Sequence, residues 1–390
     1  MNSMHAAVFE GPGRIVTQRQ PRPEPAPQQV RVRLHGCGVC ASNLPVWAGR
    51  PWFAYPFEPG APGHEGWGEV DAVGAEVRDW APGDRVALLS GRAYAEYDIA
   101  EPDALVRLPP ALSGLDLPGE PLACAMNILR RSDIRPGQTV AVVGVGFIGA
   151  LLIQLATGLG AQMIALSRRE YALQVARECG ASATLATEDR YAAIGAVHEL
   201  TGGSGCLRVI EAAGEQVTLD IASALCSEGG RLVIAGYHQD GPRQVDMQQW
   251  NWRGLDVVNA HERDPRVALR GLQEAVEAVA DGRLDPFPLL THRYALDRLP
   301  QAFADMEARP RASSKAWCWH ERVGATAVAC TATRLSWRRL DRTRAHARPG
   351  RQRARRGGGD RRCQRDGAAR RTPGRTGRGP AARPGGAASA

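Results

Sequence analysis

An unbroken apolar run, Thr139-Val140-Ala141-Val142-Val143, leads directly into Gly144-Val145-Gly146-Phe147-Ile148-Gly149 and then into a helix-forming run from Ala150 to Leu159. Such an apolar run is typical of a strand that is buried on both faces of a sheet. In the order strand, G-x-G-x-x-G and helix, the glycines allow a tight turn and let a pyrophosphate approach the helix N-terminus closely. A simple glycine-rich turn would not need all three glycines. The residues predicted to bind a dinucleotide here are Gly144, Gly146, Phe147, Ile148 and Gly149.

The next predicted strand, Met163 to Leu166, ends at Ser167-Arg168-Arg169. A carboxylate about 20 residues beyond the glycines would hold the ribose hydroxyls of NAD, whereas a small residue followed by Arg leaves room and charge for a 2′-phosphate. The carboxylate is missing and two arginines are present, so Ser167, Arg168 and Arg169 are predicted to bind NADP in preference to NAD. The alternative is that both arginines are solvated or stack on the adenine.

Three further apolar strands follow, each separated from the next by helical or loop sequence: Leu207 to Glu211, Gly230 to Gly236 and Leu255 to Asn259. This alternation predicts an α/β fold with a doubly wound parallel sheet. A helix is predicted from Pro265 to Asp281. The pair His261 and Glu262 lies just beyond a predicted strand, where it could face a site, although an exposed loop is the commoner setting for such a pair.

The first third of the sequence reads differently, as short alternating strands bounded by Gly and Pro, which predicts a small barrel or sandwich. The loop-like stretch from residue 37 to residue 60 carries five aromatic side chains, which either fill the edge of a core or line a pocket; the pocket is favoured because metal-ligand candidates lie on both sides. The five aromatic residues are Trp47, Trp52, Phe53, Tyr55 and Phe57.

The metal-ligand candidates are Cys40, in Gly36-Cys37-Gly38-Val39-Cys40, and His64 with Glu65, in Pro62-Gly63-His64-Glu65-Gly66. A thiolate, an imidazole and a carboxylate are the ligand types that hold a catalytic zinc with one position open. If Cys40 and His64 converge, the protein is a metalloenzyme. Otherwise His64 is a satisfied turn residue and Cys40 a small buried hydrophobe.

The amino-acid composition indicates which partners and which compartment to expect. Of the 49 basic groups, 19 lie in residues 321–390 beside only four of the 41 acidic groups, so the remaining chain carries 30 basic and 37 acidic groups. The high pI therefore indicates neither a nucleic-acid nor a membrane partner. Nine scattered cysteines suit a reducing compartment, and no apolar stretch is long enough to cross a bilayer, so a cytoplasmic protein is expected.

The last part of the chain, residues 319–390, has no hydrophobic periodicity and consists mainly of Arg, Gly, Ala, Pro and Thr. It is predicted to be disordered, and it has the composition expected of GC-rich DNA translated in a shifted frame. An arginine-rich arm that binds nucleic acid is the weaker alternative, because aromatic residues are not interleaved as such binding requires.

Taken together, the motifs resemble those of the medium-chain dehydrogenase/reductase superfamily, in particular its zinc-containing alcohol and polyol dehydrogenases. The resemblance covers roughly residues 4–318, and its motifs occur in the family's order: Gly36 to Asn43, Gly63-His64-Glu65, Gly83-Asp84-Arg85-Val86, Glu120-Pro121-Leu122 and Gly144 to Gly149. It implies a GroES-like catalytic β domain in residues 1–130, a Rossmann domain in 131–270 and a return segment in 271–318.

The resemblance also implies the roles of individual residues. Cys40 and His64 match zinc ligands, and Glu120 falls where the family places its third ligand, a Glu in polyol-type members; Cys124 is the reserve candidate. Glu65 resembles a carboxylate that binds the metal directly or supports its ligands. Ser42 matches the hydroxyl that takes the proton of the alcohol.

Three departures from the family pattern change these expectations. Asn43 replaces the usual Asp, which weakens the polarisation of the ligands, and Pro45 stands where many members have the His that completes the proton relay. Residues 86–100 contain no Cys, so the structural zinc is expected to be missing and one catalytic zinc is expected.

The implied reaction is hydride transfer between NAD(P) and a secondary alcohol or polyol, with zinc acting as a Lewis acid on the substrate oxygen. A zinc-independent quinone or enoyl reductase of the same superfamily is the nearest alternative, followed by an inactive protein with an aberrant C-terminus. The family implies a homodimer or homotetramer, with Leu255 to Asn259 as the candidate edge strand.

Overall fold

The computed structural model describes residues 2–308 and 314–319. The prediction for the tail concerns residues that lie outside this range, except for Trp319, which ends strand β15 (Lys315–Trp319) instead of beginning the tail. No helix in the described part of the chain is long and apolar enough to cross a membrane.

The predicted doubly wound sheet is present. Within the described residues it has six parallel strands in the order β10-β9-β8-β11-β12-β13. Their bounds are β8 (Thr139–Val143), β9 (Gln162–Ser167), β10 (Ala183–Ala186), β11 (Cys206–Glu211), β12 (Cys226–Ile234) and β13 (Asp256–Asn259).

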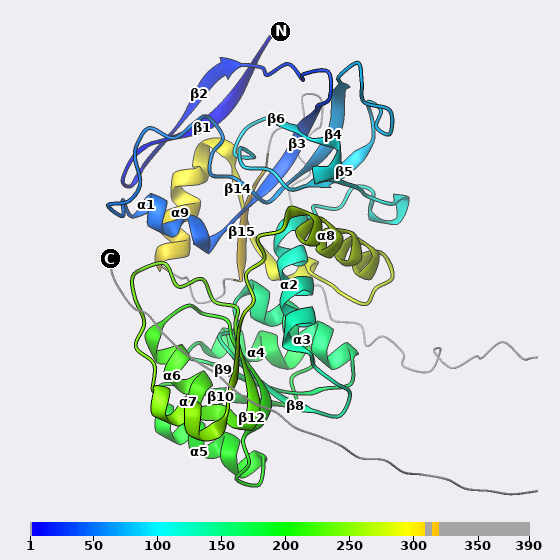
Figure 1. Ribbon diagram of the computed structural model, residues 1–390. Helices are drawn as coiled ribbons and strands as arrows, with labels where there is room; N and C mark the ends of the chain where they lie inside the picture. Colours follow the sequence, from blue (N-terminus) through cyan, green and yellow to red (C-terminus); the bar gives the residue numbers. More distant parts are fainter. Residues whose placement is uncertain (1, 309–313, 320–390) are drawn as a thin grey trace, which may run out of the picture. The chain divides into compact units, whose positions relative to one another are not determined.

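Strand β8 shows why its sequence has no polar alternation. Val140 and Val142 pack into one hydrophobic core, while Ala141 and Val143 pack into another. Successive side chains point to opposite faces of a sheet, so a strand that is covered on both faces must be apolar at every position. The first core contains residues of α2 (Gly119–Ser132), α3 (Phe147–Gly158) and α4 (Glu170–Glu178), and the second contains residues of α5 (Arg190–Leu200) and α6 (Gln216–Leu225) (Figure 1).

The first part of the chain forms the predicted β domain. A two-stranded antiparallel sheet joins β1 (Ser3–Gly11) to β2 (Arg14–Pro21). Within the described residues, a seven-stranded sheet has the order β14-β15-β3-β4-β5-β7, and β6 also pairs with β3. These strands are β3 (Val30–Val39), β4 (Gly66–Val73), β5 (Arg85–Leu88), β6 (Tyr97–Ala100), β7 (Leu105–Arg107), β14 (Leu290–Ala295) and β15.

The end of the described chain returns to this first sheet. Strand β15 pairs with β3 in antiparallel register, with Trp317 opposite Gly38, and β14 pairs with the other edge of β15. Helix α9 (Leu299–Ala308) packs beside them, because Phe303 is fully buried in the core of the β domain (Figure 1).

Helices α2 and α8 (Pro265–Ala280) pack closely against each other. A Cβ atom placed on Gly271 of α8 would lie 2.9 Å from the carbonyl oxygen of Ala123 in α2, so only glycine fits at this contact. At the start of α2, a Cβ on Gly119 would lie 2.4 Å from Leu272 and 2.8 Å from Ala87. This packing fixes the first turn of α2, which carries Glu120.

Four of the five aromatic residues between positions 37 and 60 fill the edge of the β-domain core, which was the alternative to the favoured prediction that they line a pocket. Trp47 stacks on Phe303 at 5.7 Å between ring centroids, and Phe57 lies 6.1 Å from Phe9. Phe53 and Tyr55 also pack against the core of the β domain, whereas Trp52 is 58% exposed. The aromatic residues therefore cluster because one edge of the small β domain needs large side chains to cover it.

Candidate metal and dinucleotide site

The glycine-rich turn has the geometry that a pyrophosphate requires. Gly144 has φ +104°, in the left-handed region that favours glycine, and a Cβ on Gly149 would lie 2.2 Å from the carbonyl oxygen of Gly144. Gly146 caps the N-terminus of α3 without a side-chain hydrogen bond, and a Cβ placed on it would meet nothing within 4 Å. Free space at a helix N-terminus and unused backbone N–H groups suit an anion.

Cys40, His64 and Glu65 converge in the β domain. Each offers a ligand atom, and the three atoms lie within 4.8 Å of one another. The pairing of two strands causes this convergence, because Cys40 follows the last residue of β3, while His64 and Glu65 precede the first residue of β4, and Cys37 of β3 pairs with Gly66 of β4.

The protonation of His64 follows from its hydrogen bond. Nδ1 lies 2.9 Å from the carbonyl oxygen of Pro62, which can only accept, so Nδ1 carries a proton, and Nε2 is the nitrogen that can bind a metal once it has lost its own proton. Asn43 Nδ2 donates to the same carbonyl oxygen at 2.9 Å. The backbone carbonyl of Pro62 therefore orients the imidazole, and Asn43, the residue that departs from the family's Asp, contributes by holding that carbonyl.

The pKa of His64 is also raised. Burial alone would lower it, but the hydrogen bond and the charge of Cys40, together with Glu120 and Glu65, raise the pKa of His64 to about 10 in the metal-free site. Negative charge thus accumulates around this ring, which is the environment that a divalent cation needs.

Glu65 is fully buried and is bound by the only lysine of the chain. Lys315 Nζ lies 2.6 Å from Glu65 Oε1, and the two side chains are 7% and 0% exposed. The other oxygen, Oε2, is buried and has no hydrogen-bond partner among the described residues. Lys315 Nζ also lies 5.3 Å from the centre of the Phe147 ring, so this ion pair connects the metal-ligand cluster to the glycine-rich turn.

Glu120 is not one of the three residues whose ligand atoms converge, but its carboxylate interacts electrostatically with His64 and Glu65. Burial raises its pKa, and the charges of His64 and Lys315 act against this shift. Cys124, one helical turn further along α2, donates from Sγ to Glu120 Oε1 at 3.1 Å. The two alternatives for the third ligand therefore lie next to each other on α2.

Ser42 contacts the cluster directly. Its Oγ lies 3.2 Å from Cys40 Sγ and 3.4 Å from Asn43 Oδ1. Pro45, where many relatives have a His, is buried and has no proton to relay.

A loop from the parallel sheet reaches this cluster. After β12, Gln239 Nε2 donates to the carbonyl oxygen of Ala41, the residue between Cys40 and Ser42, at 3.1 Å. His238 anchors this loop, since its Nε2 donates to Glu211 Oε2 at 3.0 Å and its Nδ1 accepts from Arg243 Nε at 2.8 Å. The loop after the carboxyl end of β12 and the segment Cys40–Ser42 are thereby held together.

The pair flagged in the sequence, His261 and Glu262, has other partners. His261 Nε2 donates to the carbonyl oxygen of Gly236 at 3.1 Å, and its ring meets Tyr237 edge-on at 5.3 Å. Glu262 accepts from the backbone N–H groups of Arg263 and Asp264, just before α8. The histidine therefore supports the loop after β12, and the glutamate fixes the start of a helix.

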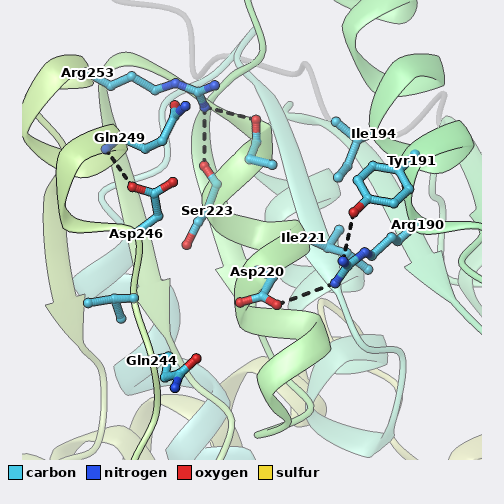
Figure 2. Close-up of a pocket in the computed structure, with 12 residues that line it drawn as sticks. Arg190, Tyr191, Ile194, Asp220, Ile221, Ser223, Gln244, Asp246, Gln249 and Arg253 are labelled. Atoms are coloured by element: carbon cyan, nitrogen blue, oxygen red, sulfur yellow. Dashed lines mark hydrogen bonds and ion pairs between the residues drawn. The ribbon is translucent and has the colours of Figure 1, made fainter.

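The described residues also line a surface pocket of about 330 Å³ between α5, α6 and α7 (Met247–Arg253) (Figure 2). Its charged groups are engaged: Arg190 pairs with Asp220 at 3.6 Å, and Arg253 donates to the carbonyl oxygens of Ser223 and Ala224. It shares no residue with the cluster around Cys40 or the glycine-rich turn.

A GroES-like β domain with a Cys-His-Glu cluster, joined to a doubly wound sheet with a dinucleotide turn, defines the class of two-domain dehydrogenases. Family comparisons agree: residues 26–119 match the alcohol dehydrogenase GroES-like domain and residues 148–279 match the zinc-binding dehydrogenase family. The chain belongs to the medium-chain dehydrogenase/reductase superfamily, among its zinc-type alcohol and polyol dehydrogenases.

Individual relatives share most of their length with this chain. Sorbitol dehydrogenase of Gallus gallus is 28% identical over 346 residues, covering 76% of this chain and 92% of the relative. An uncharacterised zinc-type alcohol dehydrogenase-like protein of Escherichia coli is 26% identical, covering 77% and 94%. A crystal structure described as a zinc-binding dehydrogenase of Sinorhizobium meliloti bound to NADP is 27% identical, with a TM-score of 0.70, covering 82% and 100%.

These findings confirm the predicted family and fold class. Sequence reasoning missed Lys315, Gln239, His238 and Glu211. The only signal for Lys315 was its uniqueness, which the amino-acid composition explained equally well. Gln239 and Glu211 gave no signal, because their roles depend on contacts between segments far apart in the chain.

Proposed function

We propose that the protein is a zinc-dependent oxidoreductase that interconverts a secondary alcohol or polyol and its ketone with NAD(P). The observation that carries the proposal is the convergence of Cys40, His64 and Glu65, in a chain whose family couples such a cluster to a dinucleotide turn. The relatives named sorbitol dehydrogenase support the polyol as substrate class.

The residues present suit one zinc ion. The donor set contains a thiolate, an imidazole whose Nε2 can bind a metal once deprotonated, and carboxylates, and Glu65 Oε2 is a buried oxygen without a described partner. Cys40 and His64 would hold the ion, with Glu120 as third ligand and Glu65 as a further ligand or support. Since residues 86–100 carry no Cys, we expect one ion per chain.

Zinc bound there would act as a Lewis acid that lowers the pKa of the substrate hydroxyl. Ser42, next to Cys40, would accept the hydroxyl proton at Oγ. The loop after β12 would hold the catalytic loop in place through Gln239 and so fix the distance between substrate and nicotinamide.

For the cofactor we propose a preference for NADP over NAD. Strand β9 ends at Ser167, which has no carboxylate, and the side chain of Arg168 is 62% exposed at the same end of the sheet. The S. meliloti relative was crystallised with NADP. Gly144, Gly146, Phe147, Ile148 and Gly149 would hold the pyrophosphate, and Arg169 would lie beside the ribose.

We also propose a homodimer or homotetramer that uses β13. This strand is the last in the order of its sheet, and Trp252, just before it, is 84% exposed. An edge strand with unpaired backbone groups and a large exposed aromatic residue suits an interface between two copies. A cytoplasmic location remains a prediction from the cysteine content.

The test is the zinc content of the purified protein, measured for the wild type beside Cys40→Ala. About one zinc per chain, lost in the variant, would support the proposal and justify an NADP-linked screen of alcohols and polyols. A folded, metal-free wild type would contradict it and favour the zinc-independent quinone or enoyl reductase, to be tested with conjugated carbonyl compounds.

A further inference from the structure

Arg168 and Glu215 form an ion pair across the dinucleotide turn. Arg168 follows β9 and Glu215 follows β11, and β8 lies between these two strands in the sheet. Arg168 Nη2 lies 3.3 Å and 3.5 Å from the two carboxylate oxygens of Glu215. The pair therefore spans the carboxyl end of β8, from which Gly144 to Gly149 begin.

The carboxylate of Glu215 is held in place from its own side. Glu215 is the N-cap of α6 and forms a capping box with Thr218, so its side chain accepts from the helix backbone while Thr218 Oγ1 accepts from the Glu215 N–H. The preceding loop is fixed by the buried Glu211, which accepts from the N–H groups of Ala213 and Gly214 at 2.9 Å and 2.8 Å. Arg168 is the more exposed partner, at 62% against 37% for Glu215.

The adenosine ribose of a dinucleotide lies at this place, because the turn after the first strand binds the pyrophosphate and the end of the next strand meets the ribose. A 2′-phosphate would take Arg168 as its partner and leave Glu215 as a negative charge close to a dianion. A 2′-hydroxyl could instead donate a hydrogen bond to Glu215.

We infer that Glu215 is a specificity-determining residue that competes with the 2′-phosphate for Arg168 and so limits the preference for NADP over NAD. The inference rests on the proposed dinucleotide function and adds a residue with the opposite effect to Arg168. The carboxylate that is missing at the end of β9 is supplied, in part, from the loop after β11.

The test compares Glu215→Gln with the wild type by fluorescence titration of NADPH and NADH, which needs neither substrate nor turnover. Gln keeps an oxygen for the capping box but removes the charge. NADPH is expected to bind about three- to tenfold more tightly in the variant at low ionic strength, with a smaller gain at high salt, because the repulsion between exposed charges is screened. NADH is expected to bind equally or up to about threefold more weakly.

Two further variants complete the experiment. Arg168→Gln should weaken NADPH about tenfold or more and NADH by much less, since it removes the cation that meets the phosphate. Asp220→Asn is the matched control: it removes a carboxylate from the same helix that pairs with Arg190 at 3.6 Å, away from the turn, and should leave both affinities unchanged. Adenosine 2′,5′-bisphosphate and AMP, titrated as competitors, should reproduce the NADPH and NADH results.

An unchanged ratio of NADPH to NADH affinity in Glu215→Gln, with both cofactors still binding, would overturn the inference and leave the proposed function intact. A wild type that binds neither cofactor would overturn both. An equal change in Asp220→Asn would assign the effect to the general charge of the domain and would also overturn the inference.

Discussion

Replacing Lys315 by Met tests the central ion pair of the site. Lys315 is 7% exposed and Glu65 0% exposed, so the substitution would leave a carboxylate without its cation in a buried setting. Burial by itself would lower the pKa of Lys315, but the charges of Glu65 and Cys40 outweigh it and raise that pKa. A raised pKa in the folded state means that this contribution is fully present below the unfolded pKa and is lost only as pH rises through the folded one; at neutral pH it is complete.

The expected loss of stability can be estimated from the difference between removing one charge and removing both charges of a buried ion pair. Bringing two charges out of water costs about as much as their attraction returns, but removing one partner leaves the other uncompensated and costs about 3–5 kcal/mol. For a chain of this size we expect the melting temperature of Lys315→Met to fall by roughly 6–20 °C. The double variant Glu65→Gln with Lys315→Met removes both charges and should recover part of that loss.

The assay is thermal unfolding followed by circular dichroism at neutral pH with a chelator present, so that loss of metal does not contribute. The matched control is Arg283→Met, which breaks an exposed pair with Asp281 at 3.3 Å and should cost less than about 1 kcal/mol. A melting temperature of Lys315→Met within 2 °C of wild type (roughly 1 kcal/mol or less) would refute the assignment of a buried, charged pair. A double variant less stable than the single one would refute the argument from uncompensated charge.

Three further predictions concern the same region. Zinc must displace a proton from His64, whose pKa is about 10 without metal, so zinc affinity measured by chelator competition should fall about tenfold per pH unit from pH 8 to pH 6, and a pH-independent affinity would contradict the assignment. The same proton stabilises the fold without metal below about pH 6.5, and this contribution is lost as pH rises through about 10. Gly38→Ala would place a Cβ 1.7 Å from Glu65 Oε2 and should destabilise the protein by about 1–3 kcal/mol and reduce its zinc content. The control Gly91→Ala, whose Cβ would meet nothing within 4 Å, should do neither, and equal melting temperatures of the two variants would show that the Glu65 carboxylate moves aside without cost. Ser42→Ala should retain zinc but lose about 10²-fold or more in kcat, with Ser42→Thr restoring it; unchanged turnover in the alanine variant would remove Ser42 from the proton path.

The sequence predicted those features that depend on local pattern. The apolar run of β8, the three glycines after it and the helix predicted from Pro265 to Asp281 are properties of neighbouring residues, and the structure has the strand and the glycine turn where they were predicted and a helix from Pro265 to Ala280. The meeting of Cys40 with His64 was a hypothesis from residue types, and strand pairing brings them together.

The features that the sequence did not predict depend on contacts between distant segments. The Glu65–Lys315 pair joins residues 250 positions apart, and Gln239 and Ala41 are 198 positions apart. The aromatic residues after Cys40 were assigned to a pocket because composition alone does not distinguish a pocket wall from the edge of a core. The contacts of Trp47 with Phe303, near the end of the described chain, and of Phe57 with Phe9, near its beginning, favour the edge of a core.

The burial of Lys315 has a consequence for chemical labelling. It is the only lysine among 390 residues, and it lies on β15 with its amino group against Glu65. An acylating reagent that modifies lysine can reach this amine only when β15 separates from β3. The rate at which Lys315 is acylated therefore reports how often β15 detaches, and mass spectrometry of a single peptide is enough to follow it.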